Sequence, residues 1–133
     1  MVESLYALLV KLGYTHPLHP PLTHVPLGMV IGAFVFGTLA LWRKHSQLAL
    51  TARHCVIFAL CGFFPTVLLG LADWQHFYQG AMLFEIKAKL ALAAVLLAVL
   101  LTSVALSRGS DPGSSRGVLS TYALSLVLAG ALG

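Results

Sequence analysis

Charged side chains are scarce in this sequence of 133 residues. Lysine, arginine, aspartate and glutamate together make up 9% of the chain, whereas hydrophobic residues make up 59%. Soluble domains carry about 25% charged residues, and disordered segments are poor in apolar groups and rich in charge. The composition therefore excludes an ordinary soluble domain and a disordered chain, and it predicts a single transmembrane domain over residues 1–133.

Cysteine is also rare. Cys55 and Cys61 are the only two, and six residues along one helix separate their Cα atoms by about 9 Å, beyond the reach of a disulfide. The chain has no CxxC or CxxCH motif, which excludes covalent c-type haem and cysteine-ligated clusters within it. No secretory signal peptide is expected, because the first apolar run follows Glu3 and not basic residues.

Four long apolar runs dominate the rest of the sequence, at about residues 22–42, 55–72, 88–106 and 118–133. A membrane helix needs about 20 apolar residues, and backbone polar groups in lipid must pair within the helix. We therefore expect an all-α fold, an integral membrane four-helix bundle with short antiparallel connections. Leucines at helical spacing ahead of the first run also predict a short N-terminal interfacial helix, namely Leu5, Leu8, Leu9 and Leu12.

The two ends of the predicted bundle differ in charge and in histidine. One end, here called the basic end, holds the connections near residues 43–54 and 107–117 and carries Arg43, Lys44, Arg53, Arg108 and Arg116. The other, the histidine end, holds both termini, the third connection and four of the six histidines, namely His16, His19, His24 and His76. The positive-inside rule places the basic end in the cytoplasm. We therefore expect a multi-pass protein of the bacterial inner membrane with both termini extracytoplasmic.

Histidine and proline share one short segment, HPLHPPLTHVPLG, at residues 16–28. Proline disfavours helix in the residue before it, so His16 and His19 are predicted to lie on a non-helical lead-in. Thr23 is the predicted N-cap of the first span, which places His24 just inside that helix.

The second span ends near a further histidine. Because neighbouring spans run antiparallel, we expect His76 opposite His24 at a similar depth, with Asp73 three residues earlier to orient the His76 ring. Gly28 and Gly32, one and two turns beyond His24, leave room for another helix or for a planar cofactor. Two neutral imidazoles suit the axial positions of a b-type haem, and imidazoles also suit Cu and Zn.

Other side chains near this end have both structural and functional interpretations. Trp74 belongs to an aromatic belt at the membrane interface, or it walls a cofactor or a quinone. Glu85, Lys87 and Lys89 begin the third span, where they snorkel or pair with Asp73. Alternatively, these three residues transfer protons or hold cofactor propionates. These four residues are therefore predicted to support the site that the histidines form.

The HPLHPPLTHVPLG segment, the apolar helix and basic loop after it, and the LGLADW sequence at residues 69–74 resemble the DUF2231 family of small bacterial four-helix membrane proteins. That family carries an HPxHPxxxHxPxG signature, and the resemblance covers about residues 15–133. Family members often begin the third helix with a histidine, where this chain has Glu85, Lys87 and Lys89. Some members are joined to cytochrome c or Rieske modules, so the resemblance implies membrane electron transfer. It marks His16, Pro17, His19, Pro20, His24, Pro26, Gly28 and Asp73.

These observations predict a redox subunit of a larger membrane complex that passes electrons between quinol and a cytochrome or Rieske partner. It would hold one haem b, with His24 and His76 as axial ligands and with His16 and His19 as alternative ligands or propionate partners. Two alternatives stay open: a Cu- or Zn-binding protein that uses the same histidines, and a structural or anchoring subunit without a cofactor. No Ser-His-Asp or HExxH arrangement predicts a catalytic residue, and no basic stripe indicates nucleic acid.

Overall fold

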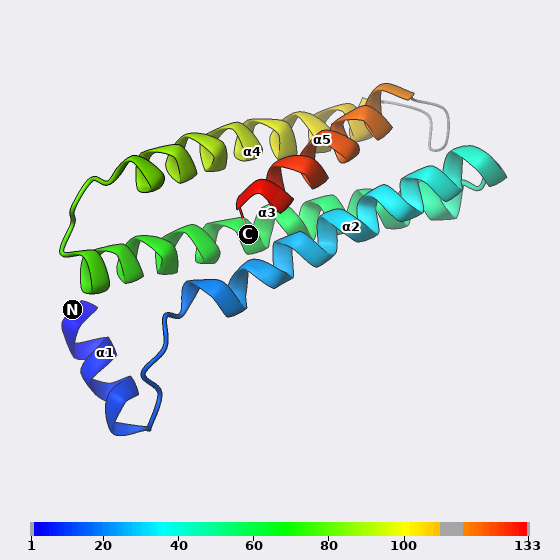
Figure 1. Ribbon diagram of the computed structural model, residues 1–133. Coiled ribbons are helices and arrows are strands. Elements are labelled where there is room, and N and C mark those ends of the chain that lie inside the picture. Colours follow the sequence, from blue (N-terminus) through cyan, green and yellow to red (C-terminus); the bar gives the residue numbers. More distant parts are fainter. Residues whose placement is uncertain (1, 110–115, 133) are drawn as a thin grey trace.

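The structure is a computed structural model that describes residues 2–109 and 116–132. These residues form five α-helices and no strand. Three of the helices are long and apolar enough to cross a membrane, and the last is a shorter apolar helix. The predicted all-α membrane bundle is confirmed (Figure 1). The helices are α1 (Val2–Lys11), α2 (His19–Arg43), α3 (Ser46–Tyr78), α4 (Phe84–Gly109) and α5 (Arg116–Leu132).

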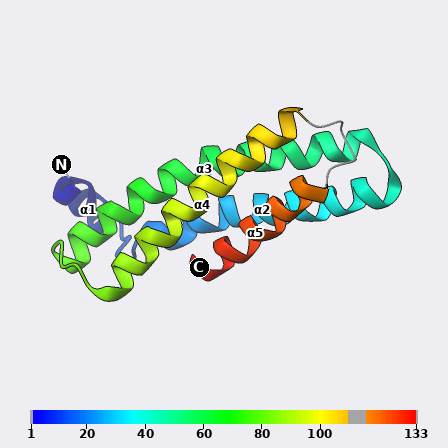
Figure 2. The ribbon, with the colours of Figure 1, turned by 90° about the horizontal axis from the view of Figure 1, so that it is seen from above.

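The helices of the bundle are arranged in a ring. α2 and α3 form a close antiparallel pair, α4 packs against α3, and α5 packs against both α4 and α2. Figures 1 and 2 show the α2–α3 turn at the same end as the end of α4 and the start of α5. The α3–α4 connection and the start of α2 lie at the opposite end. The histidine end and the basic end therefore lie at opposite ends of the bundle, as the sequence predicts, but α5 does not reach the histidine end, where the sequence places the C-terminus.

α3 is longer than the predicted 55–72 span, because it extends at both ends. With 33 residues and about 1.5 Å per residue, it is about 50 Å long, whereas the hydrocarbon core of a bilayer is about 30 Å thick. A helix of this length crosses at a tilt or projects from the hydrocarbon. α5, with 17 residues, ends beside the middle of the longer helices (Figure 1).

Small side chains form the centre of the bundle and let the helices approach closely. Ala33 of α2 and Ala59 of α3 are fully buried, and Leu100 of α4 closes the core from the other side. A Cβ on Gly37 would lie 3.0 Å from the ring of Tyr122, so this glycine lets α5 lie against α2. Such small-residue contacts are typical of helix packing in lipid, where van der Waals contact replaces the hydrophobic effect between helices.

α1 confirms the short N-terminal helix that the leucine spacing predicts. It runs across the histidine end of the bundle (Figure 1) and contacts α3. Leu8 and Val10 of this helix remain exposed, which suits a helix that lies in the membrane interface. The chain then reaches α2 through residues 12–18, which contain no regular element.

Candidate functional site

The first turn of α2 contains two prolines and is capped by a residue of α3. Pro20 and Pro21 follow His19 at the start of the helix, where a missing N–H costs no helical hydrogen bond. The N–H groups of Leu18 and His19 both donate to the Asp73 carboxylate, at 3.1 and 2.7 Å. Asp73 thus satisfies donors that a residue of the same helix usually satisfies, and its negative charge is favourable at this end of the helix dipole.

Two predictions about this segment are wrong. The helix begins at His19 and not at Thr23, whose hydroxyl donates to the carbonyl of Pro20 at 2.7 Å. His19 therefore lies in the helix and not ahead of it, whereas His16 is exposed in the non-helical lead-in, as predicted. The cause is the capping carboxylate of Asp73, which lies 54 residues from His19 in sequence and leaves no trace in the local pattern.

The ring of His19 is held against α3. Its Nδ1 lies 2.9 Å from the carbonyl oxygen of Thr66, and because a carbonyl only accepts, Nδ1 carries the hydrogen. A Cβ on Gly70 would lie 2.9 Å from this nitrogen, so the ring fits only over a glycine. The neutral ring then offers Nε2 as an acceptor, and Nε2 has no hydrogen-bond partner within residues 2–109 and 116–132.

Tyr6 brings α1 into the same network. Its side chain is buried, at 4% exposure, and its hydroxyl donates to the Asp73 carboxylate. Burial, together with the adjacent Asp73 carboxylate, raises the pKa of the Tyr6 hydroxyl well above its ordinary value. The ring stacks on His76, with centroids 4.1 Å apart and planes within 3°. Tyr6 therefore ties α1 to the end of α3.

His24 and His76 have different partners. Nδ1 of His76 lies 3.1 Å from Oε1 of Glu3, whereas Nδ1 of His24 lies 2.9 Å from the carbonyl of Pro20, one turn earlier in its own helix. The prediction that Asp73 orients His76 is wrong, because that carboxylate is used by α1 and by the start of α2. Ligation of a haem or a metal by His24 and His76 stays a prediction.

No group of three or more His, Cys, Asp or Glu side chains is placed to hold a metal ion in the described part of the chain. Nevertheless, His19, His24 and His76 share one feature. In each ring Nδ1 faces an oxygen acceptor, which leaves Nε2 available, and metal-bound histidines are commonly oriented in this way. Each ring is positioned by its own hydrogen-bond partner. Binding of Cu or Zn by these histidines therefore also stays a prediction.

The two glycines of the GxxxG pair in α2 have different surroundings. A Cβ on Gly28 would meet nothing within 4 Å, whereas one on Gly32 would lie 3.3 Å from Sγ of Cys55. Gly32 thus brings α2 close to α3, as the helix-packing interpretation expects, and Gly28 stays exposed. Cys55 and Cys61 are both free thiols.

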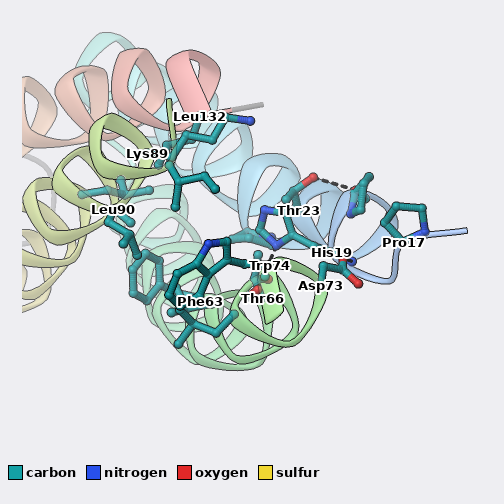
Figure 3. Close-up of a pocket in the computed structure, with 18 of the residues that line it drawn as sticks. Pro17, His19, Thr23, Phe63, Thr66, Asp73, Trp74, Lys89, Leu90 and Leu132 are labelled. Atoms are coloured by element: carbon teal, nitrogen blue, oxygen red, sulfur yellow. Dashed lines mark hydrogen bonds between the residues drawn. The ribbon is translucent and has the colours of Figure 1, made fainter. Parts of the chain in front are cut away.

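A cavity of about 480 Å³ lies among α2, α3, α4 and α5, within the range of about 300–1,000 Å³ that is usual for small-molecule sites. Figure 3 shows His19, Thr66 and Trp74 on one side of it, with Lys89 and Leu132 across from them. His24 and His76 are not part of its wall. The titratable side chains of the wall come from the histidine end, namely His19, Asp73, Tyr78, Glu85 and Lys89.

The apolar part of the cavity extends far from these groups. Its deep wall includes Val30 of α2, Phe63 of α3 and Leu100 of α4. At about 1.5 Å per residue, these side chains lie about 15–17 Å along their helices from His19, Asp73 and Lys89, respectively. The cavity is therefore elongated, with polar groups near one end and apolar side chains over the rest.

The predicted supporting residues divide between the cavity and its surroundings. Trp74 lines the cavity, as the cofactor-wall interpretation expects, and its Nε1 donates to the carbonyl of Ala81 at 2.9 Å. Glu85 and Lys89 also line the cavity, whereas Lys87 does not. None of these three residues is a partner of the Asp73 carboxylate, whose hydrogen bonds come from α1 and from the start of α2.

Sequence reasoning missed four residues of this network, namely Glu3, Tyr6, Thr66 and Gly70. Two signals were present. Tyr6 is the single aromatic residue of α1, and Gly70 lies three residues before Asp73, on the same side of α3. Neither signal names a partner, because the contacts join residues far apart in sequence.

Comparison with known proteins agrees with this architecture. A family model described as Predicted membrane protein (DUF2231) matches residues 15–133, which include α2 to α5, the HPLHPPLTHVPLG segment and Asp73. No curated protein and no solved structure matches the chain at a significant level. The match covers most of the sequence, and the chain belongs to the DUF2231 family of predicted membrane proteins.

Proposed function

We propose that this protein is a quinol-binding subunit of a membrane electron-transfer complex. The cavity is the observation that carries the proposal, because it is elongated, apolar over most of its length and polar near one end. A membrane quinol has the same division, with a flat hydroxylated ring at one end and an apolar tail at the other. Trp74, Phe77 and Tyr78 lie in the wall near the polar end, and aromatic side chains favour contact with a flat ring.

The position of the cavity favours a ligand that is dissolved in the membrane. Its walls are formed by α2, α3 and α4, which are the three helices able to cross a bilayer, together with the end of α5. Val30 and Leu100, deep in the wall, are among the most buried side chains of the bundle. A molecule that reaches them is surrounded by apolar side chains over most of its length, which excludes a wholly polar metabolite.

The same proposal assigns an orientation. The basic end lies in the cytoplasm of a bacterial inner membrane, supported by the arginines and the lysine that flank it. The histidine end is then extracytoplasmic, and a cytochrome or Rieske partner would receive electrons from quinol there. Tests of the binding site and of the orientation are independent of each other.

The two tryptophans of the chain provide a direct test of the binding site. Trp74 lines the cavity, whereas Trp42 is 78% exposed at the basic end. Trp42→Phe therefore leaves a reporter in the cavity, and Trp74→Phe leaves a matched reporter outside it. In lipid nanodiscs, a short-chain quinone should quench Trp74 with a saturable curve, while Trp42 responds only to the quinone dissolved in lipid. Equal, unsaturable quenching of both tryptophans would contradict the proposal.

A haem b near the histidine end is a second candidate. The observation that favours it is the arrangement of His19, His24 and His76, each with Nδ1 at an acceptor and Nε2 available. Nδ1 of His24 contacts Pro20, and Nδ1 of His76 contacts Glu3. Because the two rings are positioned by different partners, we assign no electron-transfer step to them as a pair. A low-spin haem spectrum that disappears in His24→Ala, with membrane insertion intact, would support this ligand. The same spectrum retained in both His24→Ala and His76→Ala would overturn the assignment.

A further inference from the structure

We infer that the cavity selects the reduced, hydroxyl-bearing form of its ligand, with Nε2 of His19 as the acceptor for the ligand hydroxyl. The inference rests on the proposed function, because it names which redox form the same site holds. It follows from an account of the polar groups that line the cavity and of the hydrogen bonds that each of them already makes.

Most of these groups are already engaged. The Asp73 carboxylate accepts from Tyr6 and from two backbone N–H groups. The Thr66 hydroxyl donates to the carbonyl of Gly62 at 2.8 Å, and Nε1 of Trp74 donates to a backbone carbonyl at 2.9 Å. The hydroxyl of Thr23 likewise donates within its own helix. None of these groups needs a ligand to complete its hydrogen bonds.

His19 differs from them. Its Nδ1 hydrogen is committed to the carbonyl of Thr66, so the neutral ring presents Nε2 only as an acceptor. The ring forms part of the cavity wall, and no described residue donates to Nε2. A ligand group that meets this nitrogen must therefore be a donor. A quinol hydroxyl donates, whereas a quinone carbonyl brings a second lone pair to an acceptor and forms no hydrogen bond.

Lys89 does not provide the same discrimination. It lines the cavity from α4, and its ammonium group only donates. It can therefore serve an oxygen atom of the quinol and of the quinone alike. Glu85 also lines the cavity from α4, and its carboxylate only accepts, so it favours the reduced form in the same sense as His19. His19 is the acceptor that is held in place by a hydrogen bond to α3, and its share of the preference is what the His19 variants measure. One hydrogen bond made by one form and missing in the other corresponds to about 2- to 10-fold in affinity.

Two variants of His19 separate its roles. In His19→Asn the side-chain amide can place an N–H near the position of Nδ1, which keeps a donor for the Thr66 carbonyl but leaves no acceptor at the position of Nε2. His19→Gln places a polar group near the position of Nε2 and loses the anchor on α3. The Trp42→Phe protein is the background, with quenching of Trp74 by a short-chain quinone and displacement by its quinol as the measurement.

We expect the background protein to bind quinol about 2- to 10-fold more tightly than quinone. His19→Asn should lower this ratio by the hydrogen bond that Nε2 loses, while quinone affinity stays within about twofold. Circular dichroism and size-exclusion chromatography check that each variant is folded. The dimethyl ether of the quinol, which cannot donate, needs no variant at all, and it should bind no more tightly than the quinone.

The outcomes distinguish the inference from the proposed function. Equal affinity for quinol, quinone and dimethyl ether overturns the selection of the reduced form and leaves quinone binding in place. A preference for quinol that is undiminished in His19→Asn overturns the assignment to His19. Absence of saturable quenching at Trp74 with any of these ligands overturns the proposed function itself, together with the inference that rests on it.

Discussion

Asp73 and Gly70 shape the site at the scale of single residues. The Asp73 carboxylate holds the hydroxyl of Tyr6 and the two N–H groups at the start of α2, so one side chain joins α1, α2 and α3. Gly70, one turn earlier, leaves the space that the His19 ring occupies. The position of the ring therefore depends on the absence of a side chain as much as on the hydrogen bond to Thr66.

Gly70→Ala tests this dependence. The added Cβ would lie 2.9 Å from Nδ1 of His19, so the ring must move and its bond to Thr66 is strained. We expect a loss of about 1–3 kcal/mol in the free energy of unfolding, typical of overpacking, together with weaker quinone binding. Denaturant unfolding followed by circular dichroism measures the first effect, and Trp74 quenching measures the second.

Gly28→Ala is the matched control for this substitution. Its Cβ would meet nothing within 4 Å, and alanine is favoured over glycine in a helix by about 1 kcal/mol. The control should therefore be as stable as the parent or more stable. If Gly70→Ala unfolded at the same denaturant concentration as Gly28→Ala, the close contact between the His19 ring and Gly70 would be refuted.

α1 is the element whose attachment depends most on one side chain. It contacts α3 through buried Tyr6, which binds Asp73 and stacks on His76. The pair of Glu3 and His76 adds an exposed contact, which contributes little because water and salt screen it. Undocking of α1 should therefore require less free energy than unfolding of the bundle.

The raised pKa of Tyr6 gives this attachment a defined response to pH. The docked helix holds the hydroxyl proton more tightly than the free helix does, so the contribution of the Tyr6 hydroxyl to docking is constant below the ordinary tyrosine value of 10.0. As pH rises above that value, docking weakens until the hydroxyl ionises in the docked state too. Spectrophotometric titration of the parent minus Tyr6→Phe isolates this group from the other three tyrosines of the four in the chain. A difference curve with its midpoint near 10 in the folded protein would contradict the buried hydrogen bond.

The elements themselves could be predicted largely from the sequence, because uncharged apolar runs and leucine spacing are local signals. The start of α2 could not. Pro20 and Pro21 mark a turn or a first helical turn equally well, and Asp73, which decides between these, lies in another helix. The four histidines were correctly placed at one end. The partners of His19 and His76, namely Thr66 and Glu3, depend on packing that no local pattern shows, whereas His24 contacts Pro20 within its own helix.

For the molecule as a whole, the difference in charge between its two ends predicts one orientation in the membrane. Ala81 lies in the α3–α4 connection at the histidine end, and Gln47 lies in the first turn of α3 at the basic end. Both are exposed. A membrane-impermeant maleimide on intact cells should label Ala81→Cys and should label Gln47→Cys only after permeabilisation. The parent, whose two cysteines lie inside α3, sets the background. The reverse pattern would place the histidine end in the cytoplasm.

The cavity is the feature that the sequence predicted least. The two glycines of the GxxxG pair in α2 indicated a site on the surface near Gly28, whereas the cavity lies among α2, α3, α4 and α5, with Trp74 and Lys89 in its wall. Each helix contributes side chains that look like ordinary core residues in the sequence. Only their relative placement leaves a volume of about 480 Å³ between them.

Photoaffinity labelling in native membranes shows whether a quinol occupies the cavity. A quinone with a photoreactive group on its ring, followed by peptide mapping, should label the cavity wall at residues 63–74 and 83–100, and excess quinol should abolish this label. Label confined to outward-facing side chains outside these two ranges, such as Phe58 and Val127, or unaffected by quinol, would show that quinone meets this protein only as a solute of the surrounding lipid.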